Sequence, residues 1–200
     1  MLNIHLLDFD GDIDRQQMSL VQGDFAPTGI VGITQDQKFA DSNISNPRIP
    51  EGIPINAFYS SFVGDTLIAT PDGIFKGAAP FVEGLSNIRA VFPSIDGDFL
   101  VADCGSCAYL VDLDEQKLNE LVCSLPILDV AFRRDTKFFA ICSQQQMSVY
   151  DIEKVKPVEK EIDGVVSVTW NPIGTWLAAA IGTIVQFFEK DLHERQQLET

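Results

Sequence analysis

Apolar and polar positions follow the same order three times between residues 88 and 188. An apolar run ends on a large aromatic residue, a polar turn follows, and a second apolar run rich in small residues comes next. The first runs are residues 88–92, 127–132 and 165–170, and the second runs are residues 99–102, 138–141 and 176–179. The aromatic ends Phe92, Phe132 and Trp170 lie 40 and 38 residues apart. This period is typical of a β-propeller blade.

The remainder of each repeat completes a four-stranded unit. Ala102, Ala140 and residues 178–180 place small side chains where the inner strands of a propeller crowd together. Asp112 and Asp151 stand where tryptophan-aspartate repeats carry their signature dipeptide. We therefore predict an all-β, WD40-like β-propeller. Third strands are expected at residues 109–113, 147–152 and 183–187, and short charged fourth strands at residues 118–122, 155–159 and 195–198.

Upstream of these repeats the pattern is weaker. An abbreviated unit is expected at residues 57–62, 65–69 and 73–76, and residues 1–35 hold scattered apolar strands. Residues 36–54 are polar and punctuated by proline, which indicates a surface connection or a disordered segment. We divide the chain into an N-terminal segment, 1–54, and a partial propeller, 55–200, with clear blades at about 88–123, 127–162 and 165–200. We expect about four to five blades in this chain, so the propeller is partial or is completed by another chain or segment.

Composition restricts the kinds of partner. The 200 residues are 46% hydrophobic and 10% aromatic, enough for a sizeable core. They contain 29 acidic and 14 basic side chains, which gives a formal net charge of -15. This charge repels phosphate and anionic lipid and attracts basic surfaces, so we expect no direct nucleic-acid ligand. Because no basic segment precedes the short apolar run at the start, we expect no secretory signal and a reducing compartment.

One segment is apolar enough to suggest a membrane span. Residues 164–188 contain no charged side chain. However, Pro172, Gly174 and Gly182 interrupt the segment, and apolar residues alternate with Ser167 and Thr169. We therefore predict three strands with two turns, and no membrane insertion.

An acidic motif near the start allows an enzymatic alternative. Residues 4–11 read Ile-His-Leu-Leu-Asp-Phe-Asp-Gly, which resembles the opening motif of haloacid-dehalogenase-type phosphatases. The resemblance implies Asp8 as nucleophile, Asp10 as acid and a bound Mg²⁺. Such an enzyme needs a doubly wound sheet with helices, whereas the downstream pattern has strand period, so a strand ending in an acidic turn is preferred. A calcium loop does not fit, because Ile13 and Ser19 stand where glycine and glutamate are required.

The four cysteines are interpreted as structural. Cys104-Gly-Ser-Cys107 has the spacing of a redox motif, but a strand rather than a helix follows it. We expect these two cysteines to flank a hairpin turn. Cys123 and Cys142 are isolated, so the two paired motifs that a zinc site requires are lacking.

Histidines and aromatic residues assign no further chemistry. His5 and His193 lie in terminal segments with no nucleophile motif nearby, so triad chemistry is not supported. The 14 phenylalanines repeat with the blade and lack basic neighbours, which indicates a core rather than a surface for stacked bases. We therefore predict a protein that is not an enzyme and has no catalytic residues, no metal site and no cofactor.

The third repeat carries a resemblance to a known family. Residues 148–152 and 165–174, with the motif Gly182-Thr-Ile-Val-Gln-Phe187, are similar to the N-terminal β-propeller of the cytoplasmic-face nucleoporin that recruits the DEAD-box mRNA-export helicase. In that family a strand ending in Trp-Ser-Pro-x-Gly is followed by an inner strand and Gly-Thr-Val-Val-Gln-Tyr. A competing motif, Phe187-Phe-Glu-Lys190, resembles the propeller of the largest subunit of the Elongator tRNA-modification complex.

The resemblance to the nucleoporin implies a protein-interaction scaffold in mRNA export and nucleocytoplasmic transport. The resemblance implies an acidic propeller surface that docks a basic partner. We therefore expect this chain at the nuclear pore complex of the nuclear envelope. Its expected partners are other nucleoporins and a basic surface such as the mRNA-export DEAD-box helicase. The alternative is a scaffold subunit of another large assembly in the cytoplasm, Elongator or a vesicle coat. The family's helicase contacts lie beyond the matched segment, so no partner-binding residue is assigned.

Overall fold

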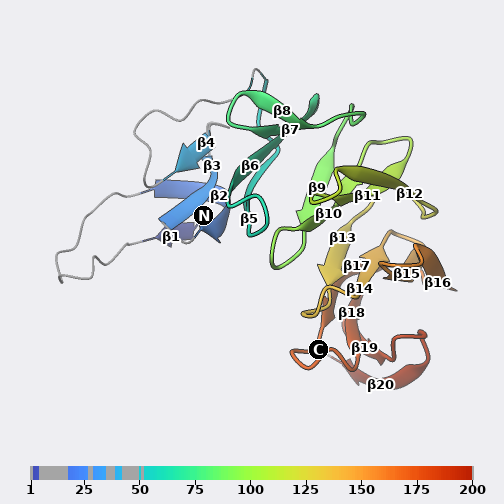
Figure 1. Cartoon of the computed structure of the whole chain (residues 1–200). Coiled ribbons are helices and arrows are strands. Elements are labelled where there is room, and N and C mark those ends of the chain that lie inside the picture. The colour runs from blue at the N-terminus through green and yellow to red at the C-terminus, as the bar shows by residue number, and fades with distance from the viewer. Residues whose placement is uncertain are drawn as a thin grey trace. The chain divides into compact units, whose positions relative to one another are not determined.

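The computed structural model consists of β-strands arranged in sheets. It describes the backbone of residues 2–4, 18–26, 29–34, 39–41, 50 and 52–199, and the side chains of residues 50 and 52–195. Every regular secondary-structure element in these ranges is a β-strand. Strands that are consecutive in the sequence form the sheets, four strands to a sheet (Figure 1). The all-β prediction is confirmed, and the repeated four-stranded sheets are β-propeller-like.

The described strands group into two compact units, Met1–Val91 and Phe92–Thr200. The first unit holds two sheets, with strand orders β1-β2-β3-β4 and β5-β6-β7-β8. Their strands are β1 (Leu2–Ile4), β2 (Met18–Ala26), β3 (Gly29–Thr34), β4 (Phe39–Asp41), β5 (Asn56–Ser60), β6 (Asp65–Thr70), β7 (Gly73–Lys76) and β8 (Ala79–Val82).

The second unit holds three sheets of the same kind, each a meander of neighbouring strands. Strand β9 crosses the division, because it begins in the first unit and ends in the second. The strands are β9 (Ala90–Pro93), β10 (Phe99–Asp103), β11 (Ala108–Asp112), β12 (Lys117–Leu121), β13 (Asp129–Phe132), β14 (Phe138–Cys142), β15 (Gln146–Asp151), β16 (Lys156–Glu161), β17 (Val165–Trp170), β18 (Leu177–Ile181), β19 (Ile184–Phe188) and β20 (Glu194–Glu199).

Each of these three sheets turns in the same way between its first and second strand. In the β13–β14 turn, the Arg133 N–H donates to the Phe138 carbonyl oxygen, and the Thr136 N–H donates to the Arg133 carbonyl oxygen, both at 2.8 Å. The residue that closes the turn has a positive φ, which is 55° at Thr136 and 70° and 77° at the equivalent Gly97 and Gly174. Glycine adopts this conformation without steric cost, which suits Gly97 and Gly174 to the β9–β10 and β17–β18 turns.

Two carboxylates join neighbouring sheets, one at the start of β13 and one at the end of β10. Asp129 Oδ2 accepts hydrogen bonds from the Val168 N–H at 3.0 Å and the Ser167 hydroxyl at 2.6 Å. The Asp103 carboxylate is 2% exposed and accepts a hydrogen bond from the Ile127 N–H at 3.1 Å. Removing either carboxylate would leave a backbone donor without its partner, so both residues fix how consecutive sheets pack.

Aromatic rings fill the core between sheets β9–β12 and β13–β16. The Phe139 ring stacks between Phe132, at a centroid distance of 5.3 Å, and Tyr150, at 4.9 Å. Phe139 and Tyr150 are fully buried, and the Tyr150 hydroxyl donates to the Val122 carbonyl oxygen. The ring stack thus combines apolar burial with one satisfied polar group.

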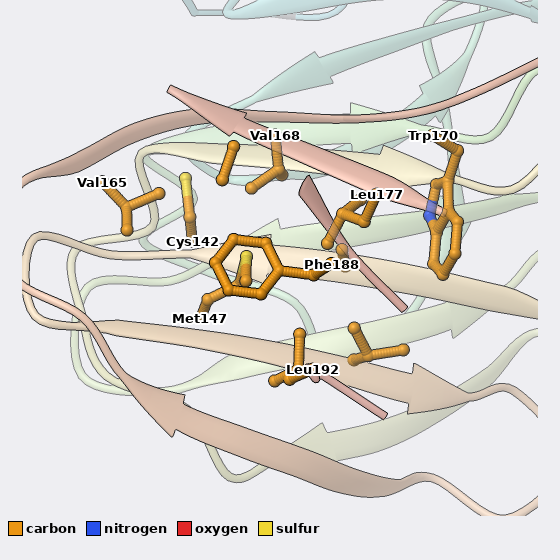
Figure 2. Packing of buried hydrophobic residues seen from close by; sticks show 11 residues of the cluster. Cys142, Met147, Val165, Val168, Trp170, Leu177, Phe188 and Leu192 are labelled. Carbon is orange, nitrogen blue, oxygen red and sulfur yellow. The ribbon is translucent and has the colours of Figure 1, made fainter. Parts of the chain in front are cut away.

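A second cluster lies between sheets β13–β16 and β17–β20. Figure 2 shows the Phe188 ring in the middle of this cluster, among Met147, Leu177 and Leu192. Trp170 closes one side and donates its indole N–H to the Ala131 carbonyl oxygen at 3.0 Å. The aromatic residue that ends the first apolar run is therefore a contact between sheets.

The N-terminal part differs in detail from the sequence prediction. Strand β4 lies inside residues 36–54, where a connection was expected, and β8 gives the abbreviated unit a fourth strand. The two compact units divide after Val91, and the expected boundary at residue 54 stays a prediction. A strand of three or four residues carries too little alternation to stand out from a polar, proline-rich background.

Candidate interaction surface

A hollow lies beside the turn between β14 and β15. It consists of two adjoining cavities of about 510 and 580 Å³, which share Gln145 and Asp163 in their linings. We call it the Gln145 hollow. The described lining residues come from the β12–β13 connection, the β14–β15 turn, the β16–β17 connection and the adjoining ends of β15, β16 and β17. They are Ser124, Leu128, Gln144, Gln145, Gln146, Glu161, Ile162, Asp163, Gly164, Val165 and Val166.

Hydrogen bonds hold the walls of the hollow in place. The Ile162 N–H donates to the Gln145 carbonyl oxygen at 3.1 Å, and the Gly164 N–H donates to the Gln144 carbonyl oxygen at 2.8 Å. On the other side, the Ser124 hydroxyl donates to Gln146 Oε1 at 2.6 Å. The β14–β15 turn is thus bonded to both neighbouring connections, which makes the hollow a preformed feature.

The opposite ends of the strands form a different cluster. The Arg133 guanidinium pairs with both carboxylate oxygens of Asp135, at 2.7 and 2.6 Å, and lies over the Phe138 ring at 4.3 Å. The Arg133 Nη1 also donates to the Gly174 carbonyl oxygen of the next sheet at 3.5 Å. We call Arg133, Asp135, Phe138 and Gly174 the Arg133 cluster. Its charges are paired within the chain.

The predicted hairpin turn at the cysteine pair is present. The Cys104 N–H donates to the Cys107 carbonyl oxygen at 2.9 Å, and Gly105 between them has a φ of 82°. Cys104 is buried and Cys107 half-buried. A hydrogen bond with Cys107 raises the pKa of the Tyr109 hydroxyl. A strand, β11, follows the pair, so the helix N-terminus that activates redox thiols is not at this site.

The other two thiols are suited to packing rather than to chemistry. Burial raises the pKa of Cys123 to about 11 and that of Cys142 to about 12. Both thiols are therefore protonated at neutral pH, and the thiolate is the reactive form. Within the described residues, no group of three or more His, Cys, Asp or Glu side chains could hold a metal ion.

The remaining sequence candidates are the acidic residues near the start, the two histidines and the apolar segment. Asp8, Asp10 and His5, and the acidic residues weighed as a calcium loop, lie outside the residues whose side chains are described. His193 lies in the β19–β20 connection, with Nε2 3.7 Å from the Asp191 carboxylate. The apolar segment 164–188 forms β17, β18 and β19. Within the described ranges, the structure contains no long apolar helix of the kind that spans a membrane.

Sequence reasoning missed the residues of the Gln145 hollow. The available signal was the run Gln144-Gln-Gln146, three amide side chains in a tight turn between two apolar strands. Asp163 follows a charged strand and by itself gave no indication of a site. Only the packing of successive sheets brings these residues together.

Comparisons with known proteins give little guidance. No family model and no curated protein matches the chain. A solved structure of Kuenenia stuttgartiensis hydrazine synthase is similar, with 21% sequence identity and a TM-score of 0.49, over 57% of this chain. This chain spans 36% of the length of the chain it matches. A similarity at this level assigns neither a family nor an activity.

Proposed function

We propose that the chain is a non-enzymatic scaffold that binds protein partners. The observation that carries this proposal is the stacking of four-stranded sheets through apolar faces, because such repeats offer broad rigid surfaces between their turns. The net charge of -15 supports a basic partner, since opposite charge accelerates association and selects against acidic partners.

The finer proposal is a partial propeller that another chain or segment completes. In sheet β13–β16, one face carries Ala140, Cys142, Met147 and Val149, which are 0% to 3% exposed under sheet β17–β20. The equivalent face of sheet β17–β20 carries apolar residues that are only half-buried: Ala178, Ala180, Val185 and Phe187. The face of sheet β13–β16 is covered by the next sheet. This supports a further sheet as the cover for the equivalent face of sheet β17–β20.

The assembly that we propose is the nuclear pore complex, with a role in mRNA export and nucleocytoplasmic transport. The support is the resemblance of Gly182-Thr-Ile-Val-Gln-Phe187 to the nucleoporin propeller. This motif forms the turn and most of β19. The partners would be other nucleoporins and a basic surface such as the mRNA-export DEAD-box helicase. The second candidate is a scaffold subunit of Elongator, favoured by Phe187-Phe-Glu-Lys190.

Affinity purification of the tagged chain from native extract tests the assignment. We expect nuclear-pore components and a helicase whose recovery falls as salt concentration rises. Recovery of acetyltransferase subunits instead would favour Elongator. Phe187→Asp serves as the variant for the half-buried face, and Val158→Asp, an exposed position on β16, as its matched control. Loss of partners with both variants would contradict the role of that face.

The phosphatase alternative has its own test. Asp8 and Asp10 would act with Mg²⁺ on a phosphate ester. We expect no Mg²⁺-dependent hydrolysis of p-nitrophenyl phosphate by the purified chain. Hydrolysis that Asp8→Asn abolishes would overturn the scaffold proposal.

A further inference from the structure

The Gln145 hollow has an apolar border. Leu128 is 37% exposed and Val166 is 56% exposed, and both line the second cavity with Gly164. At Gly164 no atom lies within 4 Å of the position that a Cβ would take, so the space there is open. Val166 falls at a β-bulge between Val165 and Ser167, and a bulge turns a side chain away from the regular pairing. An aliphatic side chain of a ligand can therefore contact Leu128 and Val166 together.

The charged residues in the described part of the lining are acidic. Glu161 and Asp163 are exposed, and among the described residues no lysine or arginine lines either cavity. The adjacent Lys160 is engaged elsewhere, because its Nζ lies 2.7 Å from Glu194 Oε1 and 5.1 Å from the centroid of the Phe188 ring. The hollow is therefore negative at neutral pH and favours a cationic ligand.

Exposed amides add hydrogen-bonding capacity. Gln144 and Gln145 are exposed, and each carboxamide offers both a donor and an acceptor. Gln146 differs, because its Oε1 already accepts from Ser124. Two free-standing amides beside an apolar border suit the main chain of an extended peptide, which presents N–H and C=O groups in alternation.

We propose that the Gln145 hollow binds an extended peptide segment of a partner protein in which a lysine or arginine neighbours an aliphatic residue. The basic side chain pairs with Asp163 and Glu161, the aliphatic side chain contacts Leu128 and Val166, and the amides bond the peptide backbone. This inference rests on the proposed scaffold function and names the surface and the partner chemistry. Nucleic acid does not suit the hollow, because its phosphates would meet two carboxylates.

Fluorescence anisotropy with the purified full chain tests the inference. The probe is a short fluorescein-labelled peptide in which lysine and leucine alternate, and two comparison peptides replace lysine with glutamate or leucine with serine. We expect saturable binding of the lysine–leucine peptide, and binding at least about tenfold weaker for each comparison peptide, because each loses one class of contact. Absence of saturable binding of the lysine–leucine peptide would overturn the inference.

Matched variants separate the hollow from the general acidity of the chain. Asp163→Lys should weaken binding by at least about tenfold, whereas Asp114→Lys, the same charge change in the exposed β11–β12 turn, should change it less than about twofold. Val166→Ser should weaken binding about threefold to fivefold, and Val158→Ser, on β16, should leave it unchanged. Equal effects of the two lysine variants would contradict a specific site.

Chemical shifts provide a readout that needs no variant. Adding the lysine–leucine peptide to the ¹⁵N-labelled chain should shift the amide signals of Gln144, Gln145 and Gly164 more than those of Asp114 and Val158. Shifts spread evenly over the surface would count against the inference. If affinity purification with Asp163→Lys recovers every partner of the unaltered chain, the scaffold function stands and partners dock elsewhere.

Discussion

The two ends of the strands in the second unit differ in how their polar groups are used. At the Arg133 cluster, a guanidinium, a carboxylate, an aromatic ring and a carbonyl oxygen satisfy one another across two sheets. At the Gln145 hollow, the backbone is bonded but the Gln144, Gln145 and Asp163 side chains extend from an exposed surface. The difference shows that the charges of the Arg133 cluster are satisfied within the chain, whereas the hollow leaves polar side chains exposed for the partner that we propose.

Two glycines with nearly the same backbone conformation give the largest expected contrast. Gly174, at the Arg133 cluster, has a φ of 77°, and a Cβ there would lie 2.7 Å from Arg133 Cδ. Gly164, at the hollow, has a φ of 78° and open space. Gly174→Ala should cost about 2–4 kcal/mol of unfolding free energy, because backbone strain and a steric clash combine. Gly164→Ala should cost about 1–2 kcal/mol, from backbone strain alone. Urea denaturation measures both.

A double-mutant cycle sharpens the same contrast. If the Arg133 side chain causes the additional cost, Gly174→Ala in an Arg133→Ala background should cost no more than Gly164→Ala does in the unaltered chain. An additive result would mean that another contact, not the Arg133 side chain, limits the space at Gly174.

Removing the guanidinium should have an intermediate effect. Arg133→Met keeps an apolar stem but removes the pair with Asp135 and the contact with the Phe138 ring, so we expect a loss of about 1–2 kcal/mol. The neighbouring Arg134 is exposed, and Arg134→Met should change stability by less than about 0.5 kcal/mol. The midpoint of thermal unfolding compares the two variants. Equal midpoints for the two variants would mean that the Arg133 cluster does not stabilise the fold.

A hydrogen bond between two turns should contribute somewhat less. The Thr136 hydroxyl donates to Asp96 Oδ2 at 3.0 Å and so links the β13–β14 turn to the β9–β10 turn. Thr136→Val removes the donor and keeps the shape, which should cost about 1 kcal/mol in urea denaturation. Thr175→Val in the next turn is unsuitable as a control, because Thr175 bonds Asn171. Thr169→Val, at an exposed position on β17, is the matched comparison.

The smallest expected effect concerns pH. The Arg133 guanidinium lowers the pKa of Asp135 below its ordinary value of 3.8, so the charged carboxylate is favoured in the folded chain. The resulting stability is fully present above about pH 5 and is lost as the pH falls through the lowered pKa. Because Asp135 is substantially exposed, the contribution should stay below about 1 kcal/mol. Asp135→Asn should therefore reduce the acid dependence of unfolding slightly, which urea denaturation at a series of pH values measures.

The sequence was most informative where each strand carries its own signal. The alternation in residues 165–170 predicted β17 with the bounds that the structure shows, and residues 73–76 did the same for β7. The third strands of the last three sheets, β11, β15 and β19, are each displaced by one residue from the predicted bounds. Both ends of these strands run into turns, and a single residue at such an end can belong to the strand or to the turn.

The hollow could not be predicted because its residues lie far apart in the sequence. Ser124, Gln145 and Asp163 belong to three separate connections, and none of them forms a recognised motif. The pairing of Arg133 with Gly174 depends likewise on how one sheet lies on the next, 41 residues later. Periodicity reports which face of a strand is apolar but not which turn of another sheet it will meet.

The order of strands within each sheet has a consequence for synthesis on the ribosome. Because every described sheet is built from four consecutive strands, it can be completed as soon as its own residues have left the exit tunnel. Sheet β13–β16, however, then exposes Met147 and Val149 until β17–β20 has been translated. During that interval the nascent chain presents a ready binding site for a chaperone, and a translational pause near residue 165 would prolong it.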